Sequence, residues 1–144
     1  MANFLIPDEA LTTEAFTSRL EGDSLPAHLG IQAEQIARDK IVLALTVTPN
    51  HMAPNGFLHA GTVITLADTA AGFSTVANLR EGQNFTTIEL KSNFFSTVRE
   101  GRIRAVTSPV HIGRTTHVWD AEVTSEVTGK RLALFRCTQM VLTV

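Results

Sequence analysis

The longest apolar segment of the chain spans residues 60–77 and contains one charged residue, Asp68, near its middle. The other residues of the segment are apolar or small and neutral, which predicts a helix covered by protein on most of its sides. An ionised carboxylate in such a place costs several kcal/mol unless something compensates it. Strongly perturbed titratable groups gather at functional sites, so Asp68 is the first candidate for chemistry.

The pattern before this segment predicts a helix and two strands. Residues 7–20 repeat apolar positions at helical spacing after Pro7, and Gly22 ends the predicted helix. Residues 25–30 are interpreted as a connector. Two extended segments follow between residues 31 and 48, and the second, 41–48, is rich in β-branched residues. Turn-forming residues then fill 49–56, which predicts a loop directly before the apolar helix.

Four further strands are predicted after the helix. They cover residues 85–97, 102–112, 115–126 and 131–144, and short turns at 99–101, 112–114 and 128–130 separate them, each with a glycine. Such short connections require antiparallel neighbours, so the helix should lie across one face of a curled antiparallel sheet. We expect an α+β fold in a single domain, 1–144, in which residues 1–29 form an N-terminal helical decoration.

Composition narrows the possible functions. With 144 residues, 44% of them hydrophobic and 18% charged, the chain fits one compact soluble domain. The formal charge is −2 and no basic run is present, so we expect neither a nucleic-acid partner nor an anionic membrane. No targeting segment or long apolar run is evident, which makes the cytoplasm the expected location. Cys137 is the only cysteine and is interpreted as a small buried hydrophobe.

A motif around the helix start carries a family resemblance. The segment Gly56-Phe-Leu-His-Ala-Gly61 is followed, seven residues after Gly61, by Asp68-Thr-Ala-Ala-Gly72. This resembles the signature of the phenylacetate-degradation (PaaI-like) acyl-CoA thioesterases, in which a Gly-x-x-His-Gly-Gly loop opens a helix with an acidic residue in its middle. The resemblance covers about residues 30–144. It implies a hotdog fold, an acyl-CoA substrate and a homo-oligomer, at least a dimer and often a tetramer, with active sites shared between subunits.

The helix itself explains how such a site could hydrolyse a thioester. The first turn, near His59, Ala60 and Gly61, leaves backbone N–H groups without partners inside the helix, and these can stabilise an oxyanion. Asp68 can attack the thioester carbonyl or can take a proton from an attacking water. We interpret His59 as the residue that holds the loop and aims these N–H groups, rather than as a general acid or base.

The spacing of these groups predicts a site shared between two chains. Ala60 and Asp68 are eight residues apart, which is ~12 Å along a helix axis. A catalytic group acts from about 3 Å, so one carbonyl carbon cannot contact both ends of that distance. Two antiparallel copies of the helix across a two-fold axis would bring the start of one helix to the Asp68 of the other.

Several neighbouring residues are weaker candidates. Thr65 and Gly72 share the helix face of Asp68 and could line a substrate pocket, although Gly72 could equally permit close helix packing. By its offset from Asp68, Thr86 best matches the hydroxyl residue that helps to hold the attacking water in related enzymes, or it could be an ordinary strand threonine. Related sequences often carry Asn or Gln where Ala53 stands here, so we expect Asn55, or alternatively Asn50, to supply the missing amide.

A turn between two strands is the remaining candidate site. Gly113, Arg114 and Thr115 could cradle the phosphates of coenzyme A, as the resemblance implies, or they could form a solvated hairpin. No histidine spacing suggests a metal site, and we expect no cofactor apart from coenzyme A as part of the substrate. The paired Asp and His of hotdog hydratases are not found. A non-catalytic acyl-CoA binding protein remains the alternative, because Ala53 departs from the family pattern.

Overall fold

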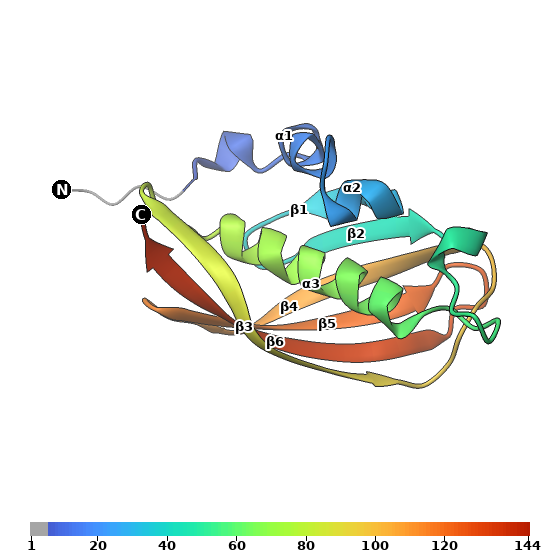
Figure 1. Ribbon diagram of the computed structural model, residues 1–144. Helices are drawn as coiled ribbons and strands as arrows, with labels where there is room; N and C mark the ends of the chain where they lie inside the picture. Colours follow the sequence, from blue (N-terminus) through green and yellow to red (C-terminus); the bar gives the residue numbers. More distant parts are fainter. Residues whose placement is uncertain (1–5) are drawn as a thin grey trace.

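The computed structural model describes residues 6–144, so residues 1–5 of the predicted decoration lie outside the described residues. Helix α3 (Ala60–Val76) crosses the concave face of a single six-stranded antiparallel sheet, and the short N-terminal helices lie beside it (Figure 1). This is the predicted α+β arrangement. The strands are β1 (Gln32–Ile36), β2 (Ile41–Thr46), β3 (Gln83–Phe94), β4 (Arg102–Ile112), β5 (Thr116–Ser125) and β6 (Arg131–Thr143).

Strand alternation builds the core under α3. Along β5 every second residue is buried, including Trp119, Ala121 and Val123, while the intervening side chains are half-buried on the outer face. The paired strand β6 presents Phe135 and Cys137 to the same side. Because successive side chains of a strand point to opposite faces, one face of the sheet packs on the helix and the other remains polar.

One predicted connection is wrong. The turn at 99–101 was expected to join two neighbouring strands, but the strand order is β1-β2-β4-β5-β6-β3, so β3 pairs with β6 and β4 pairs with β2. The chain leaves β3 along β6, where Phe95 N–H donates to the carbonyl of Leu132 (2.8 Å), and reaches β2, where the Gly101 carbonyl accepts from Val47 N–H (2.8 Å). As a result, β3 is an edge strand.

The N-terminal region is divided into more and shorter helical elements than predicted. Instead of one helix over 7–20, the chain forms a 3₁₀ turn (Asp8–Ala10), α1 (Thr13–Thr17) and a second 3₁₀ turn (Ser18–Leu20). The hydroxyl of Thr12 accepts from Ala15 N–H and so caps the start of a new helix, α1. The expected connector contains α2 (Leu25–Leu29), which begins at the Ser24 cap and ends at Gly30 in the left-handed conformation.

Helix α3 is covered unevenly along its length. From Ala70 to Val76 every residue is buried, whereas a stripe in the first half is only half-buried. The stripe repeats at helical spacing, so it forms one continuous face. Its members, named here the open stripe, are Gly61, Ile64, Thr65, Asp68 and Thr69. Within residues 6–144, no helix is long and apolar enough to cross a membrane.

Candidate active site

The start of α3 offers one uncommitted backbone donor. His59 is the N-cap, and its Nδ1 accepts from Gly61 N–H at 2.7 Å. The N–H groups of Thr62 and Val63 both donate to the carbonyl of His59, at 3.0 and 3.4 Å. In the described part of the chain, the Ala60 N–H makes no hydrogen bond within the protein. At the positive end of the helix dipole, this N–H is therefore the donor available to a ligand oxygen.

The hydrogen bond of His59 defines what its ring can do. Because Nδ1 accepts from Gly61 N–H, the neutral ring carries its proton on Nε2. The ring could not take a second proton at Nδ1 without losing this cap. The geometry therefore supports the interpretation of His59 as the residue that holds the helix start rather than as a general base.

The geometry also explains why alanine is compatible with position 60 but glycine stands at 61. A Cβ on Gly61 would lie 2.9 Å from His59 Nδ1, so a larger residue would push the ring away from its bond. Ala60 is exposed, and its methyl group leaves the backbone N–H in place. The departure from the family's second glycine thus keeps the polarising donor.

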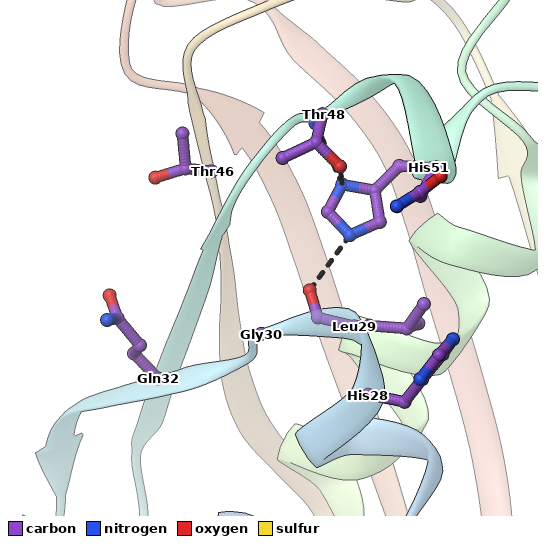
Figure 2. Close-up of a pocket in the computed structure, with 8 residues that line it drawn as sticks. His28, Leu29, Gly30, Gln32, Thr46, Thr48 and His51 are labelled. Carbon is purple, nitrogen blue, oxygen red and sulfur yellow. Dashed lines mark hydrogen bonds between the residues drawn. The ribbon is translucent and has the colours of Figure 1, made fainter.

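A buried histidine anchors the loop before α3. The ring of His51 accepts from Thr48 N–H through Nδ1 (3.0 Å) and donates from Nε2 to the carbonyl of Leu29 at the end of α2 (2.8 Å). Figure 2 shows the contacts of this ring with the Thr48 hydroxyl and with the Leu29 carbonyl. Its own carbonyl accepts from His59 N–H (3.0 Å) and from the Thr62 hydroxyl (2.9 Å). A cavity of about 320 Å³ lies beside this ring, and neither Asp68 nor His59 lines it. His51 therefore ties α2 to the helix start and is not part of a pocket with Asp68.

Asp68 is half-buried on the open stripe, and a strand hydroxyl contacts it. The hydroxyl of Thr87 on β3 donates to Asp68 Oδ1 at 3.1 Å. Burial raises the pKa of Asp68 above its ordinary value, and the hydrogen bond from Thr87 offsets part of that rise. A carboxylate with a raised pKa is a stronger base, which suits a group that takes a proton from water.

The hydroxyl beside Asp68 belongs to Thr87, and the prediction of Thr86 is corrected. In β3, Phe85 and Thr87 face the helix, whereas Thr86 pairs with Met140 and is exposed on the opposite face. A shift of one residue along a strand reverses the side-chain direction. The two adjacent threonines are alike in sequence. Only the strand register distinguishes them: Thr87 lies on the same face of β3 as Phe85, and Thr86 lies on the opposite face.

The two predicted pocket residues of the helix have different environments. Thr65 lies on the open stripe, and its hydroxyl donates to the carbonyl of Gly61 (2.7 Å). Gly72 is buried, and a Cβ there would lie 3.1 Å from the Phe85 ring. The structure therefore favours the alternative that Gly72 permits close helix packing, while Thr65 remains beside the face that carries Asp68.

Asn55 lies at the exposed tip of the loop before α3. Its Oδ1 accepts from Phe57 N–H (3.3 Å), and Ala53 and Phe57 close the loop through a backbone bond of 2.7 Å. The amide oxygen of Asn55 is thus occupied by its own loop. No hydrogen bond among residues 6–144 joins Asn55 to Asp68.

The turn between β4 and β5 forms one wall of a polar cavity. Gly113 and Arg114 line a cavity of about 580 Å³ together with Arg80 and His117, whereas Thr115 does not line it. His117 is buried, burial lowers the pKa of its ring, and Nδ1 has no hydrogen-bond partner in residues 6–144. From the sequence, Arg80 could reach an anionic ligand but nothing selected it, and His117 was interpreted as a structural or surface residue. Neither the C-terminal end of α3 nor the register of β5 could be placed beside this turn.

The remaining candidate chemistry is weak in the described part of the chain. No group of three or more His, Cys, Asp or Glu side chains within residues 6–144 could hold a metal ion. Cys137 is buried, and burial together with the charge of Asp68 raises the pKa of its thiol to about 12. A thiol that stays protonated at neutral pH is a poor nucleophile. Asp68 and the Ala60 N–H are therefore the reactive groups to account for.

Comparisons with known proteins bear on this site. A family model described as "Thioesterase superfamily" matches residues 55–131, which include the whole of α3. A 1,4-dihydroxy-2-naphthoyl-CoA hydrolase from Listeria monocytogenes is 31% identical over 110 residues, which are 76% of this chain and 89% of that protein.

Solved structures show the same architecture. The thioesterase HI1161 from Haemophilus influenzae has a TM-score of 0.85 at 28% identity, covering 92% of this chain and 91% of its own. The PaaI protein from Escherichia coli has a TM-score of 0.77 at 23% identity, covering 88% of this chain and 89% of its own. These likenesses confirm the predicted hotdog fold.

Proposed function

The chain belongs to the thioesterase superfamily and is a thioesterase, and from this premise we propose that it hydrolyses an acyl-CoA with Asp68 as the general base. The observation that carries the proposal is the half-buried Asp68 carboxylate, which has a raised pKa and one hydrogen bond from Thr87. A base held in this way can take a proton from a water molecule at neutral pH.

We further propose that the carbonyl is polarised by the helix start of a partner subunit. Among residues 6–144 the Ala60 N–H has no partner, and it points out of the start of α3, ~12 Å along the axis from Asp68. The edge strand β3 supports a two-fold partner, because it is twelve residues long and, in the described part of the chain, unpaired on one side. It also exposes large apolar side chains, Ile88 at 51% and Phe94 at 44% among them. Such an edge favours pairing with a second copy.

In the proposed reaction, the Ala60 N–H of one subunit binds the thioester oxygen, and Asp68 of the other takes a proton from water. The resulting hydroxide attacks the carbonyl carbon, and the N–H stabilises the oxyanion of the tetrahedral intermediate. Collapse of the intermediate breaks the C–S bond. The thiolate of coenzyme A then leaves with the proton from Asp68, which restores the carboxylate.

The cavity beside the β4–β5 turn is the proposed place for the phosphates of coenzyme A. Arg80 and Arg114 both line it, and guanidinium groups bind phosphate oxygens in a fixed fork geometry. Gly113 lets the backbone approach, while Thr115 is left out of the cavity. In the proposed phosphate site, Arg80 replaces Thr115, which was predicted to join Gly113 and Arg114.

Release of free thiol tests the function. Wild-type protein is assayed on a panel of acyl-CoAs that includes 1,4-dihydroxy-2-naphthoyl-CoA, the substrate in the name of the Listeria relative. We expect turnover of at least one member and a loss of about 10² to 10⁴ in kcat for Asp68→Asn. Thermal melts check that the variant is folded.

Two other outcomes would contradict the proposal. Binding of acyl-CoA without release of thiol would favour the non-catalytic binding protein. Hydrolysis in H₂¹⁸O separates base from nucleophile in a single turnover: a general base puts the label only into the released acid, whereas a nucleophilic Asp68 would carry it in its own carboxylate.

A further inference from the structure

A buried amide next to Thr87 has no part in the reaction as described above. Gln139 of β6 is fully buried and pairs with Thr87 in the β3–β6 register, so both side chains lie on the helix side of the sheet. The amide lies 3.4 Å from Thr87 Oγ1 and hydrogen bonds to the Thr75 hydroxyl of α3. Thr75 Oγ1 also accepts from Trp119 Nε1–H at 3.0 Å. A fully buried amide is costly, so its place beside the Asp68–Thr87 pair calls for an explanation.

The neighbours of Gln139 determine how its amide is oriented. With the amide nitrogen toward Thr87, the amide oxygen would face the carbonyl of Ala71, and the nitrogen would face the N–H of Gly72. Turned by 180°, the nitrogen donates to Thr75 and to the Ala71 carbonyl (3.2 Å), and the oxygen accepts from Gly72 N–H (3.2 Å). We adopt the turned orientation, because it gives each polar atom a partner of the opposite kind. Oε1 then occupies the position beside the Thr87 hydroxyl.

We propose that Gln139 is a positioning residue that gives the Thr87 hydroxyl a second acceptor, so that Thr87 can follow the change in protonation of Asp68 during turnover. While Asp68 is ionised, Thr87 O–H donates to Oδ1. Once Asp68 has taken a proton from water, its new O–H donates to Thr87 Oγ1, and the Thr87 proton turns to Gln139 Oε1. No covalent bond changes at Thr87 or Gln139, and the transferred proton stays on Asp68 until the thiolate leaves. This inference rests on the proposed general-base role of Asp68.

The consequence is that Gln139 stabilises the protonated form of Asp68. Without an acceptor at Oε1, the Thr87 hydroxyl would have no second place for its proton when Asp68 becomes a donor. An unsatisfied buried donor costs free energy, and this cost would fall on the state that follows proton transfer. Thr87 and Gln139 therefore act in opposite directions: Thr87 supports the carboxylate, and Gln139 supports the acid.

Few other titratable groups of the described chain surround Asp68. Helix α3 itself has no second charged residue. On β6 the Cys137 thiol has a pKa of about 12 and stays neutral in the range of interest. Glu89 of β3 and Asp120 of β5 pair with outer-face residues of the sheet, and Arg136 holds Asp120. His117 of β5 pairs with Gln139 and is buried, and this burial lowers the pKa of its ring, which favours the neutral form. The Nδ1 of the proposed partner's helix-start histidine is committed to its own cap.

The test is the pH profile of kcat for two variants. Gln139→Met keeps a similar volume but removes the acceptor, so we expect kcat to fall about tenfold, the effect of one hydrogen bond, with KM within about twofold of wild type. Its acid limb should move to lower pH, because the protonated form of Asp68 loses support.

Thr87→Val should move the acid limb to higher pH, because it removes the bond that lowers the pKa of Asp68. Thr138→Val, the next residue of β6 on the opposite face, should leave the profile unchanged.

Shifts of the acid limb in opposite directions distinguish this role from a purely structural one. Lost packing lowers the free energy of unfolding but gives no reason for the two variants to shift the limb in opposite directions. A Gln139→Met enzyme whose kcat and acid-limb position both match those of the wild type would overturn the inference. The proposed function would stand in that case, because it depends on Asp68→Asn. If the Met variant does not fold, Gln139→Asn, which keeps an amide but withdraws its oxygen from Thr87, gives the same comparison and the same criterion.

Discussion

The two halves of α3 differ in what covers them, although both consist of small and apolar residues. The second half, from Ala70 to Val76, is buried entirely by residues of its own protomer. The first half carries the open stripe, which begins at Gly61 and includes Asp68. The protomer therefore completes its core over one half, and under the proposed function a partner subunit completes the half that carries Asp68. Stability should depend on the second half and chemistry on the first.

The helix start provides the largest test of this division. Ala60 is the first residue of α3, and the backbone of His59 before it is extended (φ −64°, ψ 132°), so proline is compatible with position 60. Ala60→Pro removes the free N–H and should lower kcat by about 10² to 10³ while the melting temperature stays near wild type. Ala60→Gly keeps the N–H and serves as the control. A Pro variant with full activity would show that this donor is not used.

The buried half should respond in the opposite way. The ring of Phe73 packs edge to face on Phe16 of α1, with centroids 5.3 Å apart, so Phe73→Ala should cost about 3 kcal/mol of the free energy of unfolding. Urea unfolding measures this loss. The kcat of the folded fraction should stay within about twofold of wild type. A large drop in kcat without a loss of stability would contradict the division between the two halves.

The smallest expected effect concerns the phosphate cavity, which is lined by Arg80, after the end of α3, and by Arg114. Arg80→Gln and Arg114→Gln should each raise KM for acyl-CoA about tenfold with little change in kcat. The same acyl group on a thiol without phosphates should show no difference between variants and wild type. An equal rise in KM for both substrates would mean that the arginines do not bind the phosphates.

Local features of the fold could be predicted from the sequence, whereas pairings between distant segments could not. The bounds of α3 and of the last four strands follow from apolar periodicity and from glycines in the turns, and they agree with the structure within a few residues. The pairing of β3 with β6 is non-local, so no turn signal reveals it. In the N-terminal region, the Thr12 cap overrides the helical spacing of the apolar residues.

The site shows the same limit. Asp68 and the helix start became candidates because a single charge stands in an apolar segment and because the motif around it resembles that of the PaaI-like family, and helix geometry then predicted a site shared between chains. The choice between Thr86 and Thr87 depends on strand register, which a shift of one residue reverses. Gln139 was missed, and nothing in the sequence selected Arg80 as a ligand-binding residue, because their partners lie on elements that only the tertiary fold brings together.

The central claim, that Asp68 works with the helix start of another subunit, is tested most directly by mixing two inactive variants. Asp68→Asn and Ala60→Pro chains are tagged differently and coexpressed, and the mixed dimer is purified through both tags. If the site is shared, one of its two sites combines an intact Asp68 with an intact helix start, so about half of the wild-type kcat per dimer should return. If each site lay within one chain, both sites of the mixed dimer would be defective, and it would be as inactive as its parents.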